Sequence, residues 1–260
     1  MKFTVFAPSY NEKSGGAWVL HFLCHSLNQI GYESNIFIYE ESKLVNPLFN
    51  TPQGLIQDSI VIYPEIIVDN PLKADKVVRY MLNKEGVLQG RMINWGEKDY
   101  PLAFSKVYKD NCDTLFYPNC DLFLFNYDGR PKTHNSFYIG KGYLFGNCPK
   151  LDCFEITREY PKTKQELAEV LRNSKILFSY DSCSATNTDA ALCGCVPYLL
   201  QKPNVDLANA ELGKFWAESP EEIDAALLAM STLYERMENL QKSFPQRLGK
   251  QVEKIIKHFS

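Results

Sequence analysis

Two aspartates separated by seven residues, Asp181 and Asp189, flank a polar turn in the second half of the chain. The turn follows a short apolar run at 176–179 and leads into a short helical stretch at 189–193. Gly194 ends that stretch, and a second apolar run follows at 196–200. This order predicts strand, turn, helix and strand. In a parallel sheet such a turn lies at the carboxyl ends of the strands, where open α/β sheets bind ligands.

The chemistry of this turn suits an anionic ligand. The start of a helix leaves backbone N–H groups without partners and carries partial positive charge. Hydroxyl and amide side chains add donors that suit a phosphate; they belong to Ser184, Thr186, Asn187 and Thr188. Ordinary helix capping explains the same residues, so the turn alone leaves both interpretations open.

A lysine between two glycines, in the sequence Gly140-Lys141-Gly142, follows an expected strand at 137–139. Such a lysine is a flexible cation that can reach a diphosphate as a point charge. A surface turn with a solvated lysine is the alternative. The position of Lys141 upstream of the polar turn, in the same expected sheet, favours a functional role.

The beginning of the chain predicts a βαβ unit. An apolar strand at 3–7 is followed by Gly15 and Gly16, which open a helix that Gly31 ends, and then by a strand at 34–39. Paired glycines at a strand-to-helix turn let a ligand approach the backbone closely. The pair is not the GxGxxG dinucleotide fingerprint, and a tight turn explains it equally well.

Further elements are expected along both halves. We expect strands at 60–63, 122–126 and 154–157, and a helix over 72–86 that starts after Asn70-Pro71. Thr163 and Glu166 form a capping box at the start of a helix that leads into the run at 176–179. Two last helices are expected at 220–242 and 247–259, separated by a break at Pro245.

Composition limits the function classes. The 260 residues carry a formal charge of −3, which argues against a nucleic-acid-binding protein that relies on bulk attraction. The eight cysteines form no paired CxxC set and the four histidines are scattered, so we expect no metal site and reduced cysteines. We find no membrane span and no signal peptide in the sequence and expect a cytoplasmic protein.

The acid pair, the small residues after it, Gly194 and Val196-Pro197 together resemble the C-terminal signature of GT-B glycosyltransferases. Aspartates stand here where that family usually has two glutamates. Lys141 is similar to the basic residue that neutralises the departing diphosphate in the family. The sequence Ser14-Gly15-Gly16 is similar to the glycine-containing loop that faces the family's interdomain cleft.

The resemblance implies an α/β fold with two Rossmann-like, doubly wound parallel-sheet domains that face a cleft. Residues 1–115 would form the N-terminal domain on the acceptor side, and residues 116–242 the domain that binds the nucleotide-sugar donor. The last helix, 243–260, would cross back and pack on the N-terminal domain.

The resemblance also implies roles for single residues. Asp181 would lie beside the transferred sugar, Asp189 would hold the ribose, and Ile156 with Thr157 would hold the base. The acceptor would lie near Gly15, Gly16 and Glu65, while the general base stays open among Glu12, Glu65 and Asp69. The diphosphate would be held by Gly140, Lys141, Ser184, Ala185, Thr186 and Asn187.

The expected function is metal-independent transfer of a sugar from a nucleotide-diphosphate sugar to a glycan, a glycolipid or another hydroxyl acceptor. No cofactor is expected beyond this substrate, and the likeness suggests polysaccharide biosynthesis. A nucleotide-sugar epimerase-like enzyme and a non-catalytic protein that binds a nucleotide or glycan are the alternatives. The sugar, the nucleotide, the stereochemical course and the oligomeric state stay open.

Overall fold

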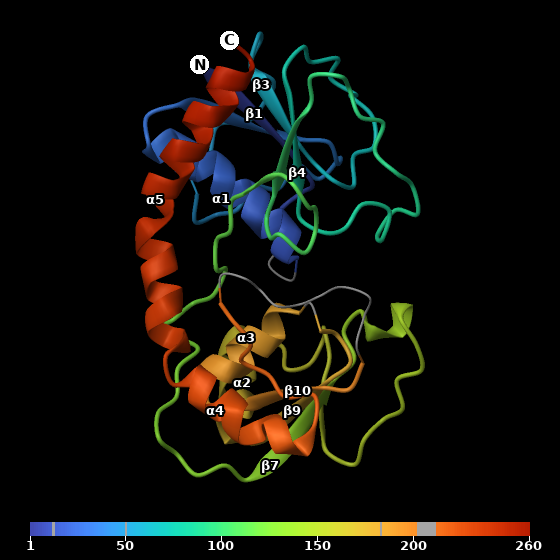
Figure 1. The fold of residues 1–260 in the computed structure, drawn as a ribbon, viewed down its shortest axis with the longest axis vertical. Coiled ribbons are helices and arrows are strands. Elements are labelled where there is room, and N and C mark those ends of the chain that lie inside the picture. Colours follow the sequence, from blue (N-terminus) through green and yellow to red (C-terminus); the bar gives the residue numbers. More distant parts are fainter. Residues whose placement is uncertain (12–13, 50, 183, 202–211) are drawn as a thin grey trace. The chain divides into compact units, whose positions relative to one another are not determined.

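The computed structural model describes residues 1–11, 14–49, 51–182, 184–201 and 212–260, and these form two compact units (Figure 1). Unit 1 comprises Met1–Tyr117 together with Lys242–Ser260, and unit 2 comprises Pro118–Gln241. The division expected from sequence, after residues 115 and 242, differs from these limits by two residues and one residue. Each unit contains one parallel sheet, so the α/β class is confirmed.

Unit 1 is built on a six-stranded parallel sheet in the order β2-β1-β3-β4-β5-β6. The helix α1, Gly15–Gln29, packs its apolar side into the core that the first strands form. The strands are β1 (Lys2–Ala7), β2 (Glu33–Ile38), β3 (Ile60–Pro64), β4 (Val77–Met81), β5 (Tyr100–Ala103) and β6 (Asp113–Thr114).

The helix expected over 72–86 is wrong, because the structure has the strand β4 in this segment. All five of its residues are buried, and it pairs with β3 on one side and β5 on the other. At its centre the guanidinium of Arg79, 1 % exposed, donates from Nε to Asp99 at 2.8 Å. A strand buried on both faces does not show the alternation of apolar and polar residues that identifies a half-buried strand, so the spacing of Val77, Val78 and Met81 did not distinguish strand from helix.

The segment before β4 is a turn rather than a helix start. The side chain of Asn70 accepts the backbone N–H of Ala74 at 2.9 Å and donates to its carbonyl at 2.8 Å. Asn70 also accepts the Tyr63 hydroxyl at 2.9 Å. The side-chain amide of Asn70 is therefore engaged in hydrogen bonds that close its own turn.

Unit 2 contains a four-stranded parallel sheet in the order β10-β9-β7-β8. The capping box is confirmed: the Thr163 side chain accepts from Glu166 N–H, and the Glu166 side chain accepts from Thr163 N–H. The elements are β7 (His134–Tyr138), η1 (Gly142–Leu144), β8 (Phe154–Ile156), α2 (Lys164–Asn173), β9 (Ser174–Ser179), α3 (Ala185–Leu192), β10 (Val196–Leu199), η2 (Pro220–Glu222) and α4 (Ile223–Met230).

The strand expected at 122–126 is wrong. Leu124 and Phe125 both donate their backbone N–H groups to the carbonyl of Asp121, at 3.1 and 2.8 Å. The Asp121 side chain accepts from Phe123 and Leu124 N–H, each at 3.0 Å. A side chain that caps its own following residues favours a turn over a strand.

The final helix, α5 (Leu233–His258), continues through Pro245, so the break expected there is also wrong. The helix expected over 220–242 is instead interrupted between α4, which ends at Met230, and α5, which begins at Leu233. Residues of α5 up to Gln241 belong to unit 2, and the rest belong to unit 1. Burial of Phe244, Leu248 and Val252 in the unit 1 core outweighs the single N–H that proline lacks.

In both sheets the chain adds its second strand on one side of the first strand and its third strand on the other side. In unit 1 the chain runs from β1 to β2 on one side and then to β3 on the other. In unit 2 it runs from β7 to β8 and then to β9 on the opposite side of β7. Ligands of open α/β sheets bind outside the carboxyl ends of the strands at such a reversal.

Candidate functional site

The reversal in unit 2 brings together the lysine loop and the polar turn. Tyr138 at the end of β7 is in register with Ser179 at the end of β9, and Tyr180 N–H donates to the Tyr138 carbonyl at 2.9 Å. The chain continues from these two ends into Gly140-Lys141 and into Asp181. Two segments that are forty residues apart in sequence are therefore neighbours at one sheet edge.

Asp181 joins the two segments through both its side chain and its backbone. Its Oδ2 atom accepts the Lys141 backbone N–H at 2.8 Å. Its carbonyl accepts from Asn187 Nδ2 at 2.9 Å and from Ser184 N–H at 3.2 Å. At 3 % exposure, Asp181 is placed to fix the site rather than to present an open carboxylate to a sugar, which was the role expected from the resemblance.

The two glycines around Lys141 are required by the closeness of this packing. Gly140 has φ of +53°, and a Cβ atom there would lie 2.5 Å from Asp181 Oδ2. A Cβ atom on Gly142 would lie 2.5 Å from the Cβ of Tyr180. This packing and the hydrogen bond to Asp181 fix the backbone of Lys141, and among the described residues none pairs with its ammonium.

The start of α3 lies at the other end of this link. Ser184 is the N-cap: its Oγ accepts Thr186 N–H at 3.2 Å and donates to Thr186 Oγ1 at 3.0 Å. Ala185, the first helical residue, is exposed, whereas Asn187 is only 4 % exposed. The Asn187 amide is therefore part of the packing, and Ala185 and Thr186 form the accessible side of the turn.

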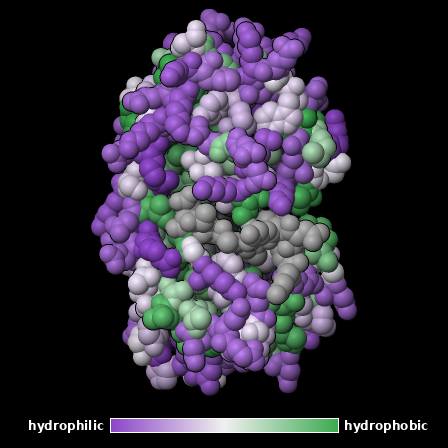
Figure 2. All heavy atoms as spheres, in the orientation of Figure 1, coloured by the Kyte–Doolittle hydropathy of each residue, from purple (hydrophilic) through white to green (hydrophobic). Residues whose placement is uncertain are grey.

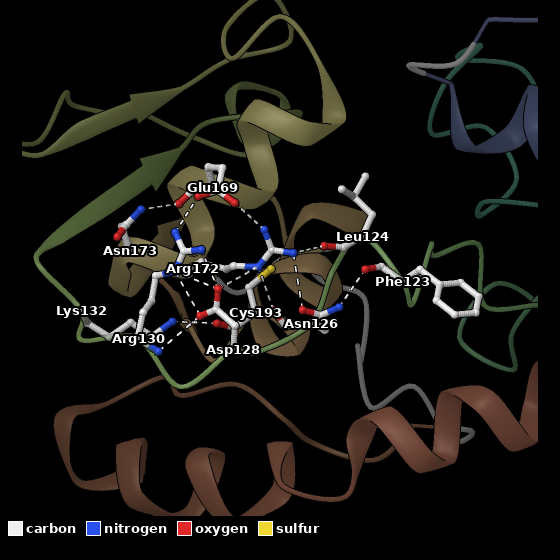
Figure 3. Close-up of polar contacts among 10 residues, drawn as sticks. All are labelled: Phe123, Leu124, Asn126, Asp128, Arg130, Lys132, Glu169, Arg172, Asn173 and Cys193. Carbon is white, nitrogen blue, oxygen red and sulfur yellow. Dashed lines mark hydrogen bonds and ion pairs between the residues drawn. The ribbon is translucent and has the colours of Figure 1, made fainter.

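A charged cluster holds the segment that precedes β7 (Figure 3). The Arg172 guanidinium on α2 donates to the Asn126 carbonyl at 3.0 Å and to Glu169 at 2.6 Å. Arg130 bridges Asp128 and Glu169 and keeps the pKa of both carboxyl groups below their usual values. The cluster ties this segment to α2.

The same segment fixes the carboxyl end of α3. The Lys132 ammonium donates to the Cys193 carbonyl at 2.6 Å (Figure 3). It also lies 5.0 Å from the centre of the Tyr127 ring. Gly194, with φ of +73°, allows that ring to approach, since a Cβ atom there would lie 2.8 Å from it. With Asp181 at one end and Lys132 at the other, α3 is held at both termini.

Asp189, in the second turn of α3, is partly buried and paired with a thiol. Cys120 Sγ donates to Asp189 Oδ1 at 3.3 Å, and Oδ2 has no donor among the described residues. Burial raises the pKa of Asp189 to about 7, an effect that the Cys120 hydrogen bond partly opposes. The ribose role expected of Asp189 stays a prediction, and the thiol partner was not foreseen from sequence.

The two residues expected to hold the base lie on and after the edge strand β8. Ile156 is 2 % exposed and belongs to the core. The Thr157 hydroxyl accepts the N–H groups of Glu159 and Tyr160, and its own N–H donates to the Tyr160 carbonyl. The hydroxyl and the N–H of Thr157 are therefore engaged in a local turn.

In unit 1 some of the residues expected around the acceptor are packed against Leu82, and Gly15 is not. Gly16 at the start of α1 lies beside Leu82, and Leu82 N–H donates to Glu65 Oε2 at 2.9 Å. Glu65 is 4 % exposed, which corrects the expectation that it faces a ligand. Gly15 has open space around it, and Glu12 lies outside the described residues.

A pocket of about 550 Å³ opens at the carboxyl ends of β1 and β2. Its rim is fixed by Ser9, whose N–H donates to Glu40 Oε2 at 3.0 Å and whose hydroxyl lies 2.5 Å from that of Ser42. It is lined by Pro8, Ser9, Tyr10, Asn11, Ser14, Ala17, Glu40, Ser42 and Leu44. Sequence reasoning missed Glu40 and Ser42, although polar residues directly after a buried strand indicate this sheet edge.

A buried histidine supports the pocket. His21 Nε2–H donates to the Pro8 carbonyl at 3.0 Å, and Nδ1 accepts Asn46 N–H at 3.2 Å. Burial lowers the pKa of His21, so the ring is neutral at pH 7. The structural requirement for one donor and one acceptor explains this histidine without a catalytic role.

The described residues contain no group of three or more His, Cys, Asp or Glu side chains that could hold a metal ion. Over the same part of the chain, no helix is both long and apolar enough to cross a membrane. The face drawn in Figure 2 is largely hydrophilic, with apolar residues in small groups.

Comparisons with known proteins give similarity at the level of the fold. No family model matches the chain, and no curated protein matches it. Among solved structures it is similar to CalG4, the calicheamicin glycosyltransferase, with 10 % identity, a TM-score of 0.45 and coverage of 100 % of this chain and 99 % of that one. It is also similar to an α-glucosyltransferase in complex with UDP and a mismatched 13-mer DNA, with 13 % identity, a TM-score of 0.44 and coverage of 98 % and 100 %.

Proposed function

We propose that the protein is a glycosyltransferase that takes a sugar from a nucleotide-diphosphate sugar and transfers it to a hydroxyl acceptor without a metal ion. The observation that carries the proposal is the double link through Asp181. It places a lysine loop and the amino-terminal end of a fixed helix at one reversal point of a parallel sheet. A cation beside the amino-terminal end of a helix, which carries partial positive charge, favours a diphosphate at this position.

The chemistry follows from where negative charge develops. When the bond between the sugar C1 atom and the diphosphate oxygen breaks, the electron pair stays on the diphosphate. The Lys141 ammonium and the start of α3 stabilise that charge. The Thr186 hydroxyl, which accepts from the Ser184 hydroxyl, donates a hydrogen bond to the diphosphate. Groups that are already fixed before the reaction stabilise such charge most effectively. The acceptor oxygen forms the new bond to C1, and its proton passes to a base.

The acceptor fits the pocket of unit 1. Hydroxyl and amide groups line it, together with the Glu40 carboxylate, and none of its lining residues is a lysine or arginine. Such a lining disfavours phosphates and favours the hydroxyl groups of a glycan or the glycan part of a glycolipid.

The test is a thermal-shift panel of UDP-, GDP- and dTDP-sugars with the full chain, followed by measurement of donor hydrolysis and sugar transfer. At least one donor raises Tm, and Lys141→Ala lowers its turnover about 100-fold because one charge-stabilising group is lost. Lys175→Ala, an exposed lysine in the same unit, is the matched control and leaves turnover unchanged.

Three results would contradict the proposal. If every donor leaves Tm unchanged, the site does not bind nucleotide sugars. If a donor binds without turnover, the protein is a binding module. If a donor is converted to its epimer without an acceptor, the protein belongs to the epimerase-like class.

A further inference from the structure

Hydrogen bonds hold both residues of the contact between Cys120 and Asp189 in place. Gln241 Nε2 donates to the carbonyls of Pro118 and Cys120, at 3.0 and 2.8 Å, and Cys120 N–H donates to Pro118 at 3.0 Å. The thiol is thus held in place by its own segment and by α5. Asp189 is held by α3, which is fixed at both ends.

The thiol can act here only as a hydrogen-bond donor. Burial and the neighbouring Asp189 raise the pKa of Cys120, so it remains protonated at neutral pH. Its S–H occupies Asp189 Oδ1 and sets the direction of the carboxyl group. Oδ2 is then the one acceptor atom of this carboxyl group that no described residue engages.

Two charged side chains among the described residues affect the ionisation of Asp189. Lys164, at the start of α2, favours the ionised carboxylate, and Asp121, in the segment that carries Cys120, disfavours it. Cys193 at the end of α3 also lies near enough to interact electrostatically with Asp189. No described residue forms an ion pair with Asp189, so its protonation changes near neutral pH, where burial has moved its pKa.

We propose that Cys120 is a positioning residue that orients the Asp189 carboxylate to accept the ribose hydroxyls of the nucleotide, and that it makes this recognition dependent on pH. The inference rests on the proposed function, because it concerns the ribose of the same donor. An ionised carboxylate accepts a hydrogen bond more strongly than a neutral acid. Recognition of the ribose hydroxyls is therefore strong above about pH 7 and weakens as the pH falls below it.

The experiment measures Kd for UDP, GDP and their 2′,3′-dideoxy counterparts with the full chain between pH 5.5 and 8.5. The ratio of the two Kd values isolates the hydroxyl contribution, since both ligands share base and diphosphate. We expect a preference of about tenfold for the hydroxylated nucleotide at pH 8, consistent with a hydrogen bond to a charged group. The preference falls towards one at pH 5.5.

The variants separate positioning from simple structural support. Cys120→Ala lowers the preference about threefold at pH 8 and moves its midpoint to higher pH, because the hydrogen bond that favours the carboxylate is lost. Cys120→Ser restores the donor and the preference. Asp189→Asn removes the pH dependence, and Cys112→Ala, which removes a thiol bonded to the Lys109 carbonyl in unit 1, changes nothing.

The outcomes are distinguishable. If neither nucleotide binds the wild-type protein at any pH, both the proposed function and this inference are overturned. If a nucleotide binds but the preference does not vary with pH, or Cys120→Ala weakens both ligands equally, only the inference is overturned.

Discussion

The two units share a topology and differ in the chemistry at their sheet edges. In each, the chain reverses direction next to its first strand, and polar residues follow that strand. Unit 2 presents Lys141 and the start of α3 there. Unit 1 presents serine hydroxyls and Glu40 around a pocket whose lining includes no lysine or arginine. Topology decides where a ligand binds, and the residues at that place decide whether it is anionic or neutral.

The units also use carboxylates in the same structural way. Asp181 accepts Lys141 N–H, Glu65 accepts Leu82 N–H, and Glu40 accepts Ser9 N–H, each near a strand end. A carboxylate is a strong acceptor for backbone N–H groups that have left the sheet ladder. An acidic residue at such a position can therefore stabilise a loop as well as bind a substrate. Its presence in a sequence does not by itself indicate a binding site.

Of the variants that test the difference between the two sheet edges, Gly140→Ala is expected to have the largest effect on stability and binding. The added Cβ atom would meet Asp181 Oδ2 and Tyr138 at 2.5 Å in a backbone with φ of +53°, so the lysine loop must move. We expect a loss of about 2–4 kcal/mol in the free energy of unfolding, together with loss of nucleotide-sugar binding.

Urea denaturation and the Tm shift with donor measure these two effects. Gly129→Ala is the matched control, because Gly129 has φ of +80° but open space around it. It has the same backbone strain without the clash, and binding is kept. Equal behaviour of the two variants would show that the packing of Gly140 on Asp181 does not hold the site.

A smaller effect is expected from Asp189→Asn on stability. The folded-state pKa of Asp189, about 7, lies above its ordinary value of 3.8. The folded protein therefore binds this proton more tightly, and stability is lost as the pH rises from about 4 to about 7. Asparagine removes this penalty, so we expect a gain of about 1–3 kcal/mol at pH 8 and almost none at pH 4.

Urea denaturation at pH 4, 6 and 8 measures the gain. Asp128→Asn is the contrasting control: Arg130 lowers the pKa of Asp128, so its ionised form stabilises the folded state and any effect has the opposite sign. A gain for Asp189→Asn that is independent of pH would contradict the assigned cause.

The smallest effect is expected from Glu40→Gln in unit 1. Glutamine keeps an acceptor for Ser9 N–H but removes the negative charge from the pocket. The Glu40 carboxylate attracts the ammonium group of glucosamine, so we expect the wild-type protein to bind glucosamine about threefold more tightly than glucose and Glu40→Gln to lose this preference. Saturation-transfer NMR with the two sugars measures it, with Glu41→Gln, outside the pocket lining, as the control. Loss of donor binding in Glu40→Gln would contradict the separation of the two sites.

Local patterns predicted the elements whose signals are local. The capping box of Thr163 and Glu166, and the run, turn and helix around Ser184, depend on contacts within a few residues. The strand β4 and the continuous α5 were not predicted, because pairing with β3 and β5 and burial of Phe244 and Leu248 decided them. Local preference differs little between such alternatives, and tertiary burial outweighs it.

The sequence by itself determined that a lysine with flanking glycines and a polar helix start are present, and that both follow strands of one α/β unit. Only the tertiary structure decided that Asp181 joins them, that Glu65 is buried against Leu82, and that Cys120 holds Asp189. The reason is physical: residue types determine which hydrogen bonds and charges are available. Which donor meets which acceptor across 40 or 69 residues depends on the order of the strands and the packing of the helices.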